Sequence, residues 1–206
     1  MILFDYLYKT YGTNEPIFIS DIKFKNYSKP WIDKEIASLC SSGKIIRFER
    51  GIYYIPTDTI FGKTLLDPNK VIEKKYISKN GETTGFYSGL TALNNLGLTT
   101  QVPNVIEICT NNEATKVRDI KIGGQKIIIR KSKIKITNDN FNTIQFLDIM
   151  NSVPNNFFDK ERKAIIKKWV QKKNITRESV LEYVSEFPDK TSRNIIESEA
   201  IFYLAQ

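Results

Sequence analysis

The sequence predicts an α+β protein: a small N-terminal module of helices and a hairpin, then a mixed α/β domain with helices at its C-terminal end. Three observations lead to this prediction. Within residues 1–56, apolar residues at helical spacing give way to two β-rich runs around a glycine. Residues 105–137 hold further β-rich runs and a two-glycine turn. From residue 143 onward, the apolar residues return to helical spacing.

The first two helices are short. Residues 1–11 place apolar side chains at helical spacing, and Gly12 ends that helix. An apolar run follows at 16–19. After it, Ser20 or Asp21 is expected to cap a brief second helix that reaches about residue 24.

A third helix is expected to begin at Ser28, its cap residue. Pro30 stands in its first turn, where a missing N–H costs little. The helix ends at Gly43, which suits a left-handed C-terminal position. Its apolar face consists of Ile32, Ile36 and Leu39.

Two β-rich runs follow the third helix. Residues 44–48 and 52–56 flank a turn that contains Gly51, which is typical of a hairpin. The order helix, helix, helix, hairpin is that of a winged helix-turn-helix, a common DNA-binding module. Such modules also serve as protein–protein adaptors, so a fold of this kind leaves both functions open.

A boundary near residues 57–66 separates this module from the rest of the chain. We expect a winged helix-turn-helix domain over 1–62 and an α+β domain with C-terminal helices over 63–206. The expected elements of the second domain are helices at 67–79 and 85–98, a strand at 105–110, a hairpin at 121–130, a strand at 133–137, and helices at 143–153, 159–173, 176–186 and 190–205.

Positive charge is concentrated in the middle of the chain. The chain holds 31 Lys and Arg against 23 Asp and Glu, a formal net charge of +8. Within residues 116–135, eight basic residues face only Asp119. A surface of one sign attracts a polyanion, although a lysine-rich protein also uses such a face for solubility. The residues chosen as a nucleic-acid or antitoxin face are Lys116, Arg118, Arg130, Lys131, Lys133 and Lys135.

Enzymatic signatures are missing from the sequence. There is no histidine, which excludes Ser-His-Asp and Cys-His catalysis and His-containing zinc sites. There is no phosphate-binding loop, dinucleotide fingerprint or nucleophile elbow. The carboxylates that remain for a Mg²⁺ site, Asp67, Glu82 and Asp148, are far apart in the sequence. We therefore expect no catalytic residue, no metal site and no cofactor.

The compartment is expected to be the cytoplasm. No apolar run approaches the roughly 18 residues of a membrane helix, so no membrane partner is expected. The N-terminal residues lack the basic region of a secretory signal. Cys40 and Cys109 sit among apolar neighbours and are expected to be buried thiols in a reducing compartment.

The third helix and the hairpin carry the candidate DNA contacts. In a winged helix-turn-helix the third helix enters the major groove, and the hairpin tip lies along phosphates or in the minor groove, where arginine is favoured. Trp31 is expected to pack in the core or at the corner of the motif. The residues expected to contact DNA are Ser28, Lys29, Lys34, Ser38, Arg47 and Arg50.

Two segments resemble AbiEi-type antitoxins. The hairpin Gly43-Lys44-Ile45-Ile46-Arg47-Phe48-Glu49-Arg50-Gly51-Ile52-Tyr53-Tyr54-Ile55-Pro56 resembles the wing of that family. The run Gly85-Phe86-Tyr87-Ser88-Gly89-Leu90-Thr91-Ala92-Leu93-Asn94-Asn95-Leu96-Gly97-Leu98, followed by Gln101-Val102-Pro103, resembles the start of its next domain. The second of these segments is the more distinctive.

The resemblance implies the antitoxin of an abortive-infection (type IV) toxin–antitoxin pair. In that family the winged domain binds inverted repeats upstream of its own operon and represses transcription. The second domain counteracts a nucleotidyltransferase-like toxin without a stable complex. We expect a DNA-binding autorepressor and antitoxin with no enzymatic activity. The alternatives are a winged-helix adaptor that does not bind DNA and an RNA-binding protein.

Overall fold

The computed structural model describes residues 2–24 and 27–205, and it divides the chain into two compact units. Unit 1 comprises Met1–Lys74 and Ile122–Gly124, and unit 2 comprises Lys75–Lys121 and Gln125–Gln206. Both units combine helices with strands, so the α+β class is confirmed.

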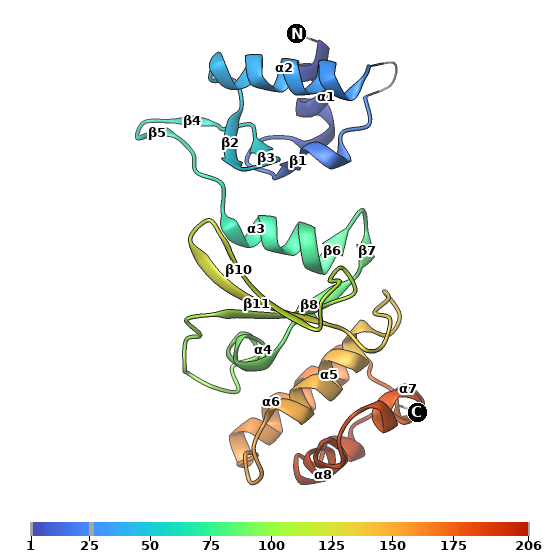
Figure 1. The fold of residues 1–206 in the computed structure, drawn as a ribbon. Helices are drawn as coiled ribbons and strands as arrows, with labels where there is room; N and C mark the ends of the chain where they lie inside the picture. Colours follow the sequence, from blue (N-terminus) through green and yellow to red (C-terminus); the bar gives the residue numbers. More distant parts are fainter. Residues whose placement is uncertain (1, 25–26, 206) are drawn as a thin grey trace. The chain divides into compact units, whose positions relative to one another are not determined.

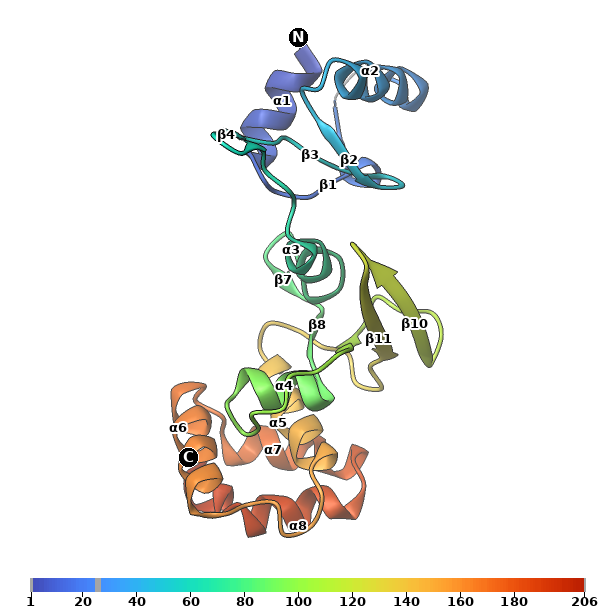
Figure 2. The ribbon, with the colours of Figure 1, turned by 90° about the vertical axis from the view of Figure 1, so that its left-hand side faces the viewer.

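Unit 1 begins with two helices over a small sheet. Helices α1 and α2 lie on one side of a three-stranded antiparallel sheet of order β1-β3-β2 (Figure 1, Figure 2). The bounds are α1 Ile2–Tyr11, β1 Ile17–Phe18, α2 Lys29–Ser41, β2 Ile46–Glu49 and β3 Ile52–Tyr54.

The core of unit 1 follows the predicted periodicity. Ile32, Ile36 and Leu39 on α2 are all buried, as the helical spacing predicts. They pack with Leu3 and Leu7 of α1, so each helix buries one face and leaves the other exposed.

The predicted second helix is wrong. The chain makes only one 3₁₀ turn, η1 (Ile19–Asp21), and the backbone is extended at Ile22. The Ser20 hydroxyl donates to the Asp21 carboxylate instead of capping a helix. Residues 22–24 carry no helix, and residues 25–26 lie outside the described part of the chain.

Short elements follow the first sheet. Asp67 caps α3 (Pro68–Ile72) by accepting a hydrogen bond from the backbone N–H of Asn69, as the sequence predicts for a helix start. The helix continues as the π-helical η2 (Glu73–Ile77). The small hairpins around it are β4 Asp58–Thr59 with β5 Gly62–Lys63, and β6 Ser78–Lys79 with β7 Glu82–Thr83.

A four-stranded sheet is the centre of unit 2. Its strand order is β10-β11-β9-β8, with β11 parallel to β9 and β8 antiparallel to β9. The predicted two-glycine turn joins β10 to β11, and both glycines have positive φ. The bounds are β8 Gly85–Tyr87, β9 Ile106–Thr110, β10 Val117–Ile122 and β11 Gln125–Lys131.

Two elements predicted for this region are wrong. The helix predicted over 85–98 is a strand, β8, followed by helix α4 (Gly89–Asn95). Gly85 lies so close to its neighbours that an added Cβ would stand 2.3 Å from the Tyr76 carbonyl oxygen. The strand predicted over 133–137 does not form, because the Asn111 side chain bonds both the N–H and the C=O of Ile136.

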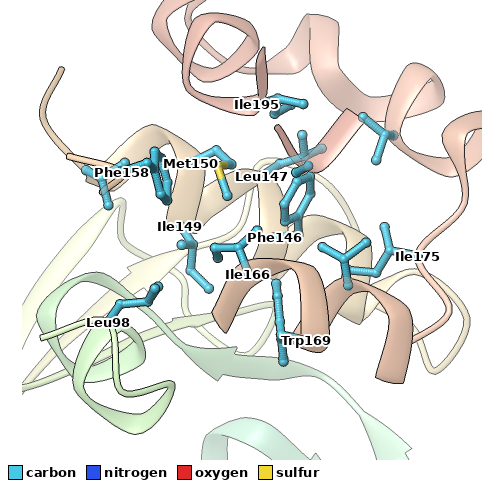
Figure 3. Close-up of a cluster of buried hydrophobic side chains, with 14 of the residues drawn as sticks. Leu98, Phe146, Leu147, Ile149, Met150, Phe158, Ile166, Trp169, Ile175 and Ile195 are labelled. Carbon is cyan, nitrogen blue, oxygen red and sulfur yellow. The ribbon is translucent and has the colours of Figure 1, made fainter. Parts of the chain in front are cut away.

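Helices build the C-terminal part of unit 2. α5 packs against α4, β8, α7 and α8. Figure 3 shows the side chains of this cluster, in which the Phe146 and Trp169 ring centroids are 6.1 Å apart. The bounds are α5 Phe141–Ser152, α6 Lys160–Lys172, α7 Arg177–Tyr183, η3 Val184–Glu186, α8 Asp189–Glu197 and η4 Ala200–Phe202. None of the helices in the described residues has the length and apolar character needed to cross a bilayer.

Candidate functional site

The exposed face of α2 carries the residues chosen as DNA contacts. Because Ile32, Ile36 and Leu39 occupy the buried face, the helical period turns the intervening polar side chains outward. All of the chosen residues before and within this helix are exposed: Ser28, Lys29, Lys34 and Ser38. Ser28 precedes the helix, but its hydroxyl makes no capping hydrogen bond within the described part of the chain.

Trp31 lies in an aromatic cluster at the start of α2. Its ring stacks on Tyr27 with centroids 3.9 Å apart, and on Phe24 at 6.1 Å. It also packs against the core of unit 1. Trp31 therefore packs at the start of α2, against the core of unit 1, as expected for a residue in the core or at the corner of the motif.

The β2–β3 hairpin carries the two arginines of the predicted wing. Arg47 stands on β2 and Arg50 in the turn, and both are exposed. The Nε of Arg47 donates to the Glu49 carbonyl oxygen at 3.4 Å. Gly51 has a φ of +77°, which lets the turn close after Arg50. Unit 1 thus brings an exposed helix face and an arginine-bearing hairpin into one small module.

The basic residues predicted for unit 2 differ in exposure and in their partners. Arg118 pairs with the buried Glu113 carboxylate at 2.8 Å. Arg130 is half-buried, and its guanidinium lies 3.8 Å from the carboxylates of both Glu107 and Asp148. The remaining chosen residues are exposed: Lys116, Lys131, Lys133 and Lys135.

Arg130 joins four elements of unit 2. Its Nη2 donates to Ser88 Oγ at 2.6 Å, and lies 3.8 Å from both Glu107 Oε2 and Asp148 Oδ2. Arg130 on β11 pairs in register with Cys109 on β9. Glu107 is two residues from Cys109 and therefore shares the same face of the sheet.

Gly89 allows the chain to approach this cluster. Its φ is +53°, and an added Cβ would stand 2.3 Å from Glu107 Oε1. The Leu90 backbone N–H donates to the same oxygen at 3.1 Å. The Ser88-Gly89-Leu90 run is thus fitted around the Glu107 carboxylate, which explains the glycine at this place in the sequence.

Asp148 is a buried carboxylate on α5, with 8% of its surface exposed. Burial raises its pKa above the ordinary value, Arg130 opposes that shift, and Glu107 adds to it. Its Oδ2 has no hydrogen-bond partner among the described residues, and the same holds for Arg130 Nε. Buried polar atoms without partners are uncommon and point to a ligand or ordered water.

A cavity of about 270 Å³ lies beside Arg130 and Asp148 within unit 2. Cys109 lines it as a free, half-buried thiol whose pKa burial raises to about 11. Sequence reasoning named Arg130 and Asp148 separately, as a basic-face residue and as a candidate carboxylate, but no local pattern connects them, because they lie on a strand and a helix. The parallel register of β9 and β11 is the signal that brings Glu107 and Arg130 together.

Metal binding finds no support at this cluster. Of Asp67, Glu82 and Asp148, only Asp148 belongs to this cluster. Arg130 Nη2 lies 3.8 Å from the carboxylates of both Asp148 and Glu107. Across residues 2–24 and 27–205, no group of three Cys, Asp or Glu side chains is arranged to hold an ion.

Residues 9–178 match the model of a protein family that is described as a family of unknown function (DUF6088). The chain belongs to the DUF6088 family. A comparison with curated proteins finds no match. The DUF6088 match includes α2, the β2–β3 hairpin and the Arg130 cluster, and it ends before α8. The family description carries no activity, so a function for this DUF6088 protein has to be argued from its own residues.

Proposed function

We propose that this DUF6088 protein is a DNA-binding transcriptional autorepressor and an antitoxin that counteracts a nucleotidyltransferase-like toxin, without enzymatic activity of its own. The observation that supports DNA binding best is the exposed face of α2. It places Lys34 and Ser38 on the side of the helix away from Ile32, Ile36 and Leu39, with Lys29 exposed in the first turn, and an arginine-bearing hairpin follows in the same unit.

The order of elements in unit 1 fits a winged helix-turn-helix with a shortened second helix. In this reading η1 takes the place of that helix, α2 enters the major groove, and β2 and β3 form the wing. Lys34 then reaches phosphate or the acceptors of guanine, and Ser38 reaches a base edge or phosphate. Arg50 at the hairpin turn contacts phosphate or the minor groove.

The antitoxin role rests on the resemblance of residues 43–56 and 85–103 to AbiEi-type antitoxins. Unit 2 is then the part that counteracts the toxin. Its exposed lysines include Lys133 and Lys135. They form a surface that binds either nucleic acid linked to the toxin's activity or further phosphates of the operator DNA. A Lys133→Glu, Lys135→Glu variant, assayed separately for operator binding and for rescue of toxin-expressing cells, assigns this surface to one of the two.

The test of the proposal is binding to the DNA upstream of the protein's own coding sequence. Fluorescence anisotropy with a labelled duplex is expected to show tight binding that a shuffled duplex of equal length does not compete away. Two chains are expected on an inverted repeat, one for each half-site. Equal binding to both duplexes would reject sequence-specific repression, and no binding by folded protein would favour the adaptor alternative.

A further inference from the structure

The cavity in unit 2 is of a size that holds one small ligand. At about 270 Å³, it lies just below the range of roughly 300–1,000 Å³ that is usual for drug-sized ligands. Its walls are largely apolar and include two aromatic rings. The apolar residues that line it include Phe86, Ile134, Ile144 and Phe187.

Two lining residues carry polar groups without partners. Arg130 Nε is a donor and Asp148 Oδ2 an acceptor, and neither has a hydrogen-bond partner among the described residues. The Nη2 of the same arginine lies 3.8 Å from Asp148 Oδ2, so the donor and the acceptor are neighbours. A buried polar group that stays without a partner destabilises the folded protein. A ligand that offers an acceptor beside a donor removes this destabilisation.

Charge around the cavity is positive. Lys116, Lys131 and Lys133 line it and are exposed, and together with Arg130 they outnumber the neighbouring carboxylates, which are Asp148 and Glu186 in the lining and Glu107 at 3.8 Å from Arg130. A ligand here therefore gains from carrying an anionic group that reaches the lysines.

We propose that this cavity binds a free nucleotide. The base lies between the apolar walls, its Watson–Crick edge meets Arg130 and Asp148, and its phosphate meets the lysines. Every nucleobase carries a hydrogen-bond acceptor next to a donor on that edge, so the pair recognises a base without selecting one. The lining thus complements three features of a nucleotide: the flat apolar face of the base, the donor–acceptor edge of the base, and the phosphate.

Simpler ligands fit the lining less well. An inorganic anion leaves the apolar walls and Asp148 without a partner, and a purely apolar ligand leaves both buried polar groups unsatisfied. The proposed DNA contacts on α2 and on the β2–β3 hairpin lie in unit 1, and Lys133 is the cavity-lining lysine that is also offered as a contact to DNA phosphate. A loss of operator binding in variants of Lys34, Ser38 or Arg50 therefore leaves the nucleotide proposal untouched.

The first experiment is calorimetric titration of the full chain with AMP, GMP, CMP and UMP. Because the pair does not select a base, each of the four nucleotides is expected to bind with one site per chain, whereas the matching nucleoside and inorganic phosphate each bind at least about tenfold more weakly. Binding of phosphate alone as tightly as the nucleotide would overturn the proposal. So would the absence of binding by all four nucleotides.

Variants of the lysines locate the site. The pair Lys131→Ala and Lys133→Ala is expected to weaken nucleotide binding about tenfold in total, because two charged contacts to phosphate are lost. Lys135→Ala is the matched control, since Lys135 is exposed and close in sequence but is not among the residues that line the cavity. Equal losses for the pair and the control would place the nucleotide elsewhere.

Cys109 supplies a readout inside the cavity. In a Cys40→Ser background it is the one thiol in the chain, and its reaction with a small methanethiosulfonate reagent is expected to slow at least fivefold when nucleotide is bound. An unchanged rate at saturating nucleotide would overturn the proposal. Protection by single-stranded RNA, without protection by any mononucleotide, would overturn it in favour of a polynucleotide site.

Discussion

Arg130 donates a hydrogen bond to Ser88 Oγ at 2.6 Å, and so ties strand β11 to the residue that precedes α4. The same guanidinium stands between the carboxylates of Glu107 and Asp148. The charge pattern assigns Arg130 to an exposed basic face. In the structure it connects β11 with β9, with α5 and with the residue that precedes α4.

Removal of Arg130 is expected to destabilise the protein. Arg130→Ala leaves two neighbouring carboxylates without their cation, at a cost of about 1–3 kcal/mol in the free energy of unfolding, since the guanidinium is partly exposed. Urea denaturation measures it. The control is the exposed neighbour Lys131, whose change to alanine is expected to stay within about 0.5 kcal/mol. Equal stability of the two variants would contradict this role for Arg130.

Gly89 is expected to tolerate no side chain. Gly89→Ala combines a positive φ with a Cβ that overlaps the Glu107 carboxylate, so it is expected to cost about 2–4 kcal/mol of unfolding free energy. Gly97 is the matched control, because its φ is +74° but nothing lies within 4 Å of its Cβ position. Gly97→Ala is expected to cost only about 1 kcal/mol. If denaturation curves show the same loss of unfolding free energy for Gly89→Ala and Gly97→Ala, the contact with the Glu107 carboxylate has no effect on stability.

The buried carboxylate of Asp148 is expected to make stability depend on pH. Because burial raises its pKa, the folded state holds the proton more tightly than the unfolded state. The free energy of unfolding therefore falls as the pH rises through the folded pKa. Asp148→Asn lacks this loss, so its stability relative to the parent protein is expected to increase as the pH rises above the ordinary pKa of an aspartate and through the raised pKa of Asp148. A difference that is constant with pH would contradict the raised pKa.

The hairpin arginine is expected to contribute through phosphate or minor-groove contact. Arg50→Ala is expected to reduce the slope of log K against log salt for operator binding by about one unit, because one fewer counterion is released. Lys9→Ala, an exposed change on α1, serves as the control and is expected to leave the slope unchanged. An unaltered slope for Arg50→Ala would show that the turn does not touch DNA.

The sequence predicted the elements whose signals are local. The helical spacing of Ile32, Ile36 and Leu39 predicted the buried face of α2, and Gly123-Gly124 predicted the hairpin turn. The helix predicted to begin at residue 67 is present as α3, which Asp67 caps.

The errors have a common physical origin in contacts between distant residues. β8 is a strand because it pairs with β9, and Ile136 is held by Asn111 instead of by a strand neighbour. The Arg130 cluster depends on the β9–β11 register and on α5. No local pattern in the sequence carries that information.

If α2 reads a specific DNA sequence, changes on its exposed face weaken binding to the upstream duplex more than binding to a shuffled duplex. Anisotropy titrations of the upstream duplex with the parent protein and with a Lys34→Ala, Ser38→Ala variant are made at one salt concentration, with Lys9→Ala as the control. The account predicts that the double variant loses at least tenfold in affinity for the upstream duplex, keeps its weak binding to a shuffled duplex, and unfolds at the same urea concentration as the parent. Parental affinity of the folded double variant for the upstream duplex would contradict it.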